Sequence, residues 1–192
     1  MVVLSAISGV LLWAPPTWLE LLRYDRAAVA AGQWWRLLTA NFVHLGFWHY
    51  ILNVVSLVLL VALCPERLSI GDWVARVSVV AVGTCLGLFW GGQGIASYVG
   101  MSGMIYGLFL LGLGRQAFAG DLIAIACLVF LAGRVGWEFV VGIPPSEERL
   151  IGGHVVPESH LFGMLAALVY AGGTSLLKKM IKLRLRSLQQ SR

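Results

Sequence analysis

The residues from 77 to 114, between Arg76 and Arg115, include no charged side chain, and this limits what the chain can fold into. A crossing helix needs about 20 apolar residues, so this stretch is long enough for two crossings. The glycine-rich segment 91–97 would join them. With 59% hydrophobic and only 12% charged residues in 192, an ordinary soluble protein is excluded. We therefore expect an all-α, polytopic membrane protein.

Six apolar segments are candidates for membrane spans, and no soluble domain or internal repeat separates them. The first is shorter than most crossing helices. The mixed segment 17–35 that follows it has apolar residues at helical spacing among charges, as in a helix that lies in the headgroup layer. We expect a single membrane domain over residues 1–192, in contact with the lipid bilayer. The expected spans are residues 2–16, 44–64, 73–90, 102–114, 122–141 and 160–177.

The distribution of basic residues predicts the orientation of these spans. Six spans return both ends of the chain to one side, and basic residues favour the cytoplasmic side. Much of the formal charge of +5 comes from a tail that follows an apolar span, so we expect no nucleic-acid partner. Both termini are expected in the cytoplasm and the loop 142–157 outside. The cytoplasmic set is Arg67, Arg115, Lys178, Lys179, Lys182, Arg184, Arg186 and Arg192, against Arg23, Arg26, Arg36 and Arg149 outside.

Ser102 stands between small residues where the fourth span begins. If Arg115 marks one membrane surface, Ser102 lies ~20 Å from it at a rise of ~1.5 Å per residue. In a hydrocarbon core of ~30 Å, that places the serine ~10 Å below the far surface. Non-helical backbone at such depth needs cover from protein or a water-filled cavity. Free amide groups beside a serine suit acyl transfer, so Ser102 is a candidate nucleophile.

A few other polar residues fall within the expected spans. His49 and Asn53 are four residues apart and share a helix face. Asn53 precedes Glu66 by as many residues as Ser102 precedes Arg115, so Asn53 and Ser102 should lie level in the bilayer. Polar groups at this depth are costly, which favours a functional role for His49 and Asn53 over helix-to-helix hydrogen bonding.

Other polar and small residues have simpler interpretations. For His44 we favour an interface role. An alternative interpretation of His160 is a capping histidine at the start of the sixth span. Arg134 and Glu138, four apart, are interpreted as a structural ion pair in preference to a substrate contact. Gly103 and Gly107 predict close helix packing. The three cysteines are widely spaced in apolar stretches, so no metal site is expected, and no cofactor either.

Taken together, these residues resemble the rhomboid intramembrane serine proteases in order, spacing and placement on the spans. The matching motifs cover nearly the whole chain. They are Trp35-Arg36, His44, His49 and Asn53, then Gly100-Met-Ser-Gly103 with Tyr106, then His160-Leu-Phe-Gly163. The run 24–36 and the compact size further resemble the rhombosortase branch, which is implicated in trimming proteins with a C-terminal Gly-Gly tail.

The resemblance implies a six-transmembrane-helix rhomboid fold with a Ser-His dyad, in a multi-pass protein of a bacterial inner membrane. Ser102 would be the nucleophile and His160 the general base and then acid, without a third carboxylate. Tyr106 would pack against the His160 imidazole and hold its orientation. The roles implied for the remaining residues are an oxyanion hole of His49, Asn53 and the Ser102 backbone N–H, with Gly100 and Gly103 permitting close backbone approach.

The substrates implied by the resemblance are single-span membrane proteins with C-terminal Gly-Gly transmembrane tails, cut near the outer interface. The main alternative is a catalytically inactive rhomboid-like protein that binds transmembrane helices as an adaptor or chaperone. Such proteins typically lack the serine or the histidine, and both are present here. A small transporter would favour mid-membrane charges or broken helices in a repeated pattern, which the sequence does not contain.

Overall fold

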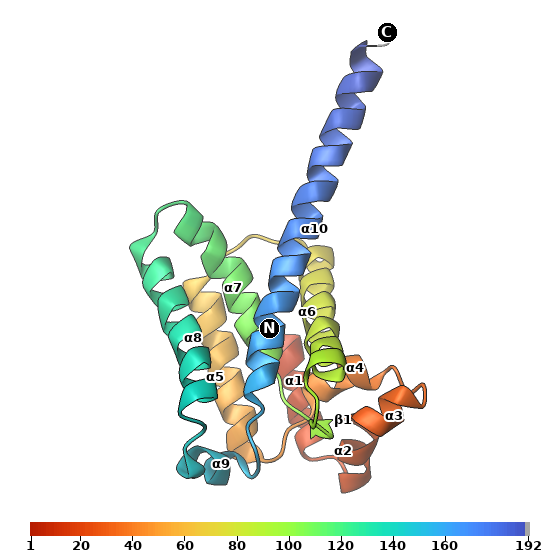
Figure 1. The fold of residues 1–192 in the computed structure, drawn as a ribbon, viewed down its shortest axis with the longest axis vertical. Helices are drawn as coiled ribbons and strands as arrows, with labels where there is room; N and C mark the ends of the chain where they lie inside the picture. The colour runs from red at the N-terminus through yellow and green to blue at the C-terminus, as the bar shows by residue number, and fades with distance from the viewer. Residues whose placement is uncertain (191–192) are drawn as a thin grey trace.

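Helices make up about three quarters of the computed structural model (Figure 1). The structure describes residues 1–190, with side chains as far as Arg184. Arg186 and Arg192 of the basic tail therefore lie outside the described side chains. The longer helices are α1 (Val2–Leu12), α5 (Phe47–Leu63), α6 (Ile70–Gly91), α7 (Ser102–Phe118), α8 (Leu122–Val140) and α10 (Pro157–Gln190). The shorter elements are α2 (Pro16–Leu22), β1 (Tyr24–Asp25), α3 (Arg26–Ala30), α4 (Arg36–Thr39), η1 (Ala40–Phe42), β2 (Ser97–Tyr98) and α9 (Pro145–Ile151).

The six expected spans correspond to six helices, but the structure supports the span count only in part. Within the described residues, α6, α8 and α10 are long and apolar enough to cross a membrane. A fourth span is obtained if α4 and η1 form one crossing with α5, from which they are bent by 93°. The first helix has only 11 residues and ends at Leu12, not at residue 16, because Pro16 begins a new helix.

The two ends of the bundle are clearly different in Figure 1. The connections α5–α6 and α7–α8 lie at the end from which α10 projects, whereas α2, β1 and α9 lie at the opposite end. At the first end, Glu66 forms ion pairs with Arg76 and with Arg115, the second at 2.8 Å. Because Glu66 follows α5 and Arg115 belongs to α7, this contact holds the two helices at a common level.

Helix α10 packs directly against α6 and α7, and small residues make this possible. A Cβ atom on Gly163 of α10 would lie 1.8 Å from the carbonyl oxygen of Gly103, and one on Gly107 would lie 2.4 Å from the carbonyl oxygen of Gly163. The close packing predicted from Gly103 and Gly107 is thus confirmed. On the other side of α10, the Phe162 ring fills the space left by Gly87 of α6.

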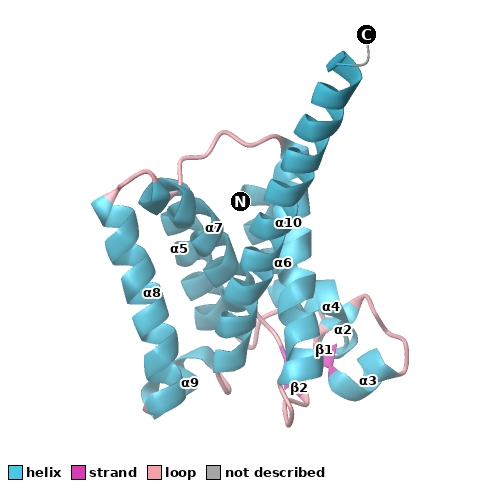
Figure 2. Cartoon of the chain, turned by 45° about the horizontal axis from the view of Figure 1, so that its top comes forward, coloured by secondary structure: helices cyan, strands magenta, loops and turns pink. Residues whose placement is uncertain are grey.

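The segment before α5 supports the loop between α6 and α7. β1 pairs with β2 in an antiparallel manner, with Tyr24 opposite Tyr98 (Figure 2). The guanidinium of Arg26 donates hydrogen bonds to the carbonyls of Leu88, Phe89 and Gly92, which lie at the end of α6. The carbonyls of the last helical turn have few backbone N–H partners, and burying such groups without a donor is costly, so Arg26 adds donors where the helix ends. The N-terminal segment therefore fixes where the α6–α7 loop begins.

Candidate active site

Ser102 is the first residue of α7, and the backbone just before it is tightly held. The N–H of Gly100 donates to the carbonyl of Ala40 at 3.0 Å, and the hydroxyl of Tyr98 donates to the carbonyl of Gly100 at 2.7 Å. Burial raises the pKa of the Tyr98 phenol, so this hydroxyl keeps its proton and remains a donor. These contacts fix the position from which Ser102 projects.

Gly100 meets two requirements of this loop at once. Its φ of 113° lies in the left-handed region, which glycine adopts without strain. A Cβ atom there would also lie 2.5 Å from Nε2 of His49, so any side chain would displace the histidine. This geometry matches the expectation that Gly100 permits close approach. Gly103 also permits it, because a Cβ atom on Gly103 would lie 2.6 Å from the carbonyl oxygen of Ser159.

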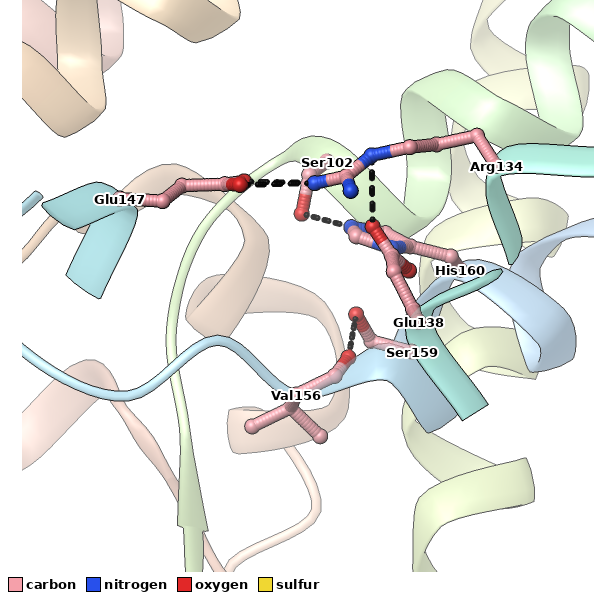
Figure 3. A network of polar contacts seen from close by, with 7 residues as sticks. All are labelled: Ser102, Arg134, Glu138, Glu147, Val156, Ser159 and His160. Atoms are coloured by element: carbon pink, nitrogen blue, oxygen red, sulfur yellow. Dashed lines mark hydrogen bonds and ion pairs between the residues drawn. The ribbon is translucent and has the colours of Figure 1, made fainter. Parts of the chain in front are cut away.

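The side chains of Ser102 and His160 meet although 58 residues separate them. Nε2 of His160 lies 3.1 Å from Oγ of Ser102, within hydrogen-bond distance (Figure 3). His160 lies in the first turn of α10, which the helix contact through Gly163 holds against α7. The ring of Tyr106 is stacked on the imidazole, with centroids 4.3 Å apart and planes 11° apart. The hydroxyl thus lies beside a nitrogen of an imidazole ring whose plane is fixed by stacking. An activated nucleophile requires this arrangement.

His49 and Asn53 line the same cavity as Ser102 from α5. The backbone N–H of Leu45 points to Nδ1 of His49 at 3.4 Å, so a neutral ring accepts there and carries its proton on Nε2. Nε2 is the atom next to Gly100, on the side of the serine loop. The amide of Asn53 donates one proton to the carbonyl of His49 at 2.9 Å and retains a second one. Both residues can thus offer a donor to the cavity.

The structure corrects one expectation, that no carboxylate accompanies the serine and the histidine. Oε2 of Glu138 lies 2.7 Å from Nδ1 of His160, on the opposite side of the ring from Ser102. Glu138 comes from α8 and is only 3% exposed. A carboxylate, an imidazole and a hydroxyl therefore follow one another in contact, and they come from three different helices.

The ion pair expected between Arg134 and Glu138 is present but has more partners than expected. Nε of Arg134 lies 3.2 Å from Oε1 of Glu138, close enough for an ion pair. The same guanidinium donates hydrogen bonds to both carboxylate oxygens of Glu147, at 2.9 and 2.8 Å (Figure 3). Since Glu147 belongs to α9, Arg134 joins this short helix to α8.

These side chains surround a cavity of about 620 Å³. It is lined by Ser102, His160, His49 and Asn53 together with Tyr106, and the segments 94–99 and 153–156 form part of its wall. His44 does not line it: the His44 ring is buried edge-on against the rings of His49 and Tyr50. The interface role expected for His44 stays a prediction.

Two residues of the candidate site, Tyr98 and Glu138, were missed by reasoning from the sequence alone. Tyr98 carried no recognisable signal, because its bond to Gly100 is made within a loop. Glu138 did carry one, as an acidic residue within an apolar span, but its spacing from Arg134 suggested that the two residues satisfied each other.

Comparison with known proteins gives two matches. A family model described as "Rhomboid domain" matches residues 31–176. A protein of Bacillus subtilis (strain 168) named "Putative rhomboid protease YdcA" is 28% identical over 106 residues, which are 55% of this chain and 53% of that relative. The chain thus spans about half the length of this curated relative.

Proposed function

Since the chain belongs to the rhomboid family, we propose that it is an intramembrane serine protease that cleaves single-span membrane proteins near the outer membrane interface. The observation that supports this best is the contact of 3.1 Å between Oγ of Ser102 and Nε2 of His160 at the wall of a cavity. An adaptor that only binds transmembrane helices has no need for this contact.

In the proposed reaction, Ser102 is the nucleophile and His160 is first the base and then the acid. As Oγ attacks the carbonyl carbon of the scissile bond, its proton moves to Nε2 of His160. When the tetrahedral intermediate collapses, the C–N bond breaks and His160 returns the proton to the leaving amine. Water or an amine acceptor then releases the acyl group from Ser102 by the same two steps in reverse.

The oxyanion of the intermediate would be bound by His49, Asn53 and the backbone N–H of Ser102. The hydrogen bonds of His49 and Asn53 leave each of them a proton to donate. One donor of an oxyanion hole is typically worth about 3 kcal/mol in the transition state. Tyr106 would keep the imidazole in the plane that both proton transfers need.

For the substrate, we propose a single transmembrane helix with a C-terminal Gly-Gly tail, as in the rhombosortase branch. A helical peptide hides its carbonyls in hydrogen bonds, so it must unwind before Ser102 can attack. Glycine costs a helix about 1 kcal/mol relative to alanine, so two adjacent glycines lower the cost of unwinding. The run 24–36, which suggested this branch, contributes β1, and β1 pairs with the strand just before the serine loop.

The proposal is tested by covalent labelling with a fluorophosphonate, which reacts only with an activated serine. The wild-type protein should be labelled, and Ser102→Ala and His160→Ala should each lose labelling and cleavage of a single-span reporter. Ser102→Ala removes one oxygen and little volume, whereas His160→Ala removes a buried ring that is stacked on Tyr106. A thermal unfolding measurement in detergent therefore checks that each variant is folded. Full turnover by either variant would refute the assignment of Ser102 and His160.

A further inference from the structure

Glu138 contacts His160, but the mechanism proposed above gives Glu138 no role. It is an acidic side chain, almost fully buried on α8, in a part of the chain rich in apolar residues. A buried carboxylate must be paired or hydrogen-bonded, because an isolated one would be very costly. Arg134 alone would provide that pairing at 3.2 Å. The second oxygen nevertheless faces the imidazole of His160 at 2.7 Å.

This contact determines where the proton of His160 lies. A carboxylate accepts hydrogen bonds and cannot donate them, so Nδ1 of His160 must carry the proton. In the neutral ring, Nε2 then bears the lone pair, and Nε2 is the atom 3.1 Å from Oγ of Ser102. A base has to present its lone pair to the hydroxyl that it deprotonates. The contact with Glu138 therefore selects the tautomer that can act on Ser102.

Tyr106 cannot replace Glu138 in this role. Its ring lies face to face with the imidazole, and a stacked ring fixes the plane of its neighbour. Stacking does not distinguish one ring nitrogen from the other, because neither nitrogen is hydrogen-bonded by the face of a phenol ring. The two residues thus restrict different properties of His160, namely the plane of the ring and the position of its proton.

The charges around Glu138 also suit a positive charge on His160 during the reaction. The side chains of Glu138, Glu147 and Arg134 form one connected cluster with two carboxylates and one guanidinium. One negative charge is in excess, and a protonated His160 balances it. Arg134 in turn holds Glu138 in place from the side facing α9.

We propose that Glu138 is a positioning residue for His160, which holds it in the Nδ1–H tautomer and stabilises the imidazolium formed when Ser102 is deprotonated. The inference rests on the proposed protease function. The site would then act as a Ser-His-Glu arrangement in place of a dyad.

The test compares Glu138→Gln, Glu138→Asp and Glu147→Gln with the wild-type protein and with Ser102→Ala. An amide can donate to Nδ1 and so favour the wrong tautomer, and a comparable carboxylate-to-amide change in a serine protease lowers kcat by about 10⁴-fold. For Glu138→Gln we expect kcat and the rate of fluorophosphonate labelling to fall by roughly 10²- to 10⁴-fold, with KM changed less than about threefold. Glu138→Asp keeps the carboxylate, so its kcat and labelling rate should be at least tenfold higher than those of Glu138→Gln.

Glu147→Gln is the matched control, because it removes a carboxylate from Arg134 and leaves the contact between Glu138 and His160 in place. It also removes the excess negative charge of the cluster, so a small effect is expected. Its kcat should fall less than about tenfold. If it falls as far as that of Glu138→Gln, Glu138 acts only through the link between α8 and α9, and the inference is wrong. It is also wrong if Glu138→Gln retains wild-type kcat, or if Glu138→Asp recovers nothing.

Two further outcomes separate this inference from the proposed function. If the wild-type protein is labelled no better than Ser102→Ala, the protease function fails, and the role of Glu138 fails with it. If Ser102→Ala is inactive and Glu138→Gln fully active, only the role of Glu138 is refuted. Thermal unfolding in detergent shows whether Glu138→Gln folds. If it does not fold, Glu138→Asp decides, because a positioning role then requires this variant to be labelled at a rate within about 10³-fold of wild type.

Discussion

Replacing Gly163 by alanine should disable the site without altering any group that takes part in the reaction. The new Cβ would lie 1.8 Å from the carbonyl oxygen of Gly103, whereas Cβ atoms essentially never come within 3.0 Å of another heavy atom. The backbones of α7 and α10 must therefore separate by about 1.2 Å at least. Ser102 adjoins Gly103, and His160 precedes Gly163 by less than one turn, so the separation reaches both side chains.

The expected magnitudes follow from this displacement. The contact between Oγ of Ser102 and Nε2 of His160, now 3.1 Å, would lengthen to about 4 Å, beyond a hydrogen bond. A misplacement of about 1 Å typically lowers a rate by about 10²-fold. Overpacking costs about 1–3 kcal/mol of stability, of which the better helix propensity of alanine returns up to about 1 kcal/mol.

The assay measures the rate of fluorophosphonate labelling and the thermal unfolding of each variant in detergent. Gly172→Ala, on the same helix, is the control, because a Cβ there meets nothing within 4 Å. It should keep the wild-type labelling rate and gain up to about 1 kcal/mol in stability. A folded Gly163→Ala variant that is labelled within threefold of the wild-type rate would show that direct backbone contact does not set the geometry of the site.

Three further outcomes are expected. Asn53→Ala should lower kcat by about 10²-fold, less than Ser102→Ala, because other oxyanion donors remain; an equal loss would contradict a shared oxyanion hole. With cytoplasmic termini, Ser146→Cys should react with an impermeant maleimide added outside intact cells and Lys179→Cys should not; the reverse pattern would refute the orientation. Changing the junction glycines of a Gly-Gly substrate to leucine should slow cleavage more than tenfold; an unchanged rate would discard both the unwinding rationale and the rhombosortase assignment.

The positions of the helices, and the meeting of Asn53 and Ser102 around one cavity, were largely predictable, because they depend on patterns local in the sequence. The charge-free stretch and its glycine-rich interruption identified α6, α7 and the loop between them. Counting residues from Glu66 and Arg115 placed Asn53 and Ser102 level, and the observed ion pair between Glu66 and Arg115 explains why the count works. Both residues line one cavity.

What could not be predicted depends on contacts between distant segments. Glu138 has an obvious partner four residues away, and nothing in its own helix indicates that α10 brings His160 to its second oxygen. The two-residue strands are too short to show an alternating pattern, so the pairing of Tyr24 with Tyr98 left no trace in the sequence. Helix α9, by contrast, could have been found from its opening prolines and the acidic residues in its first turn.

The start of α7 at Ser102 has an electrostatic consequence that no side chain provides. The N–H groups of a first helical turn have no carbonyl partner within the helix, and they form the positive end of its macrodipole. A negative charge that develops beside Ser102 is therefore attracted by the helix as a whole, by roughly 0.3–2 kcal/mol. This attraction belongs to the backbone, so it should persist in every variant that changes side chains around the cavity and leaves α7 intact.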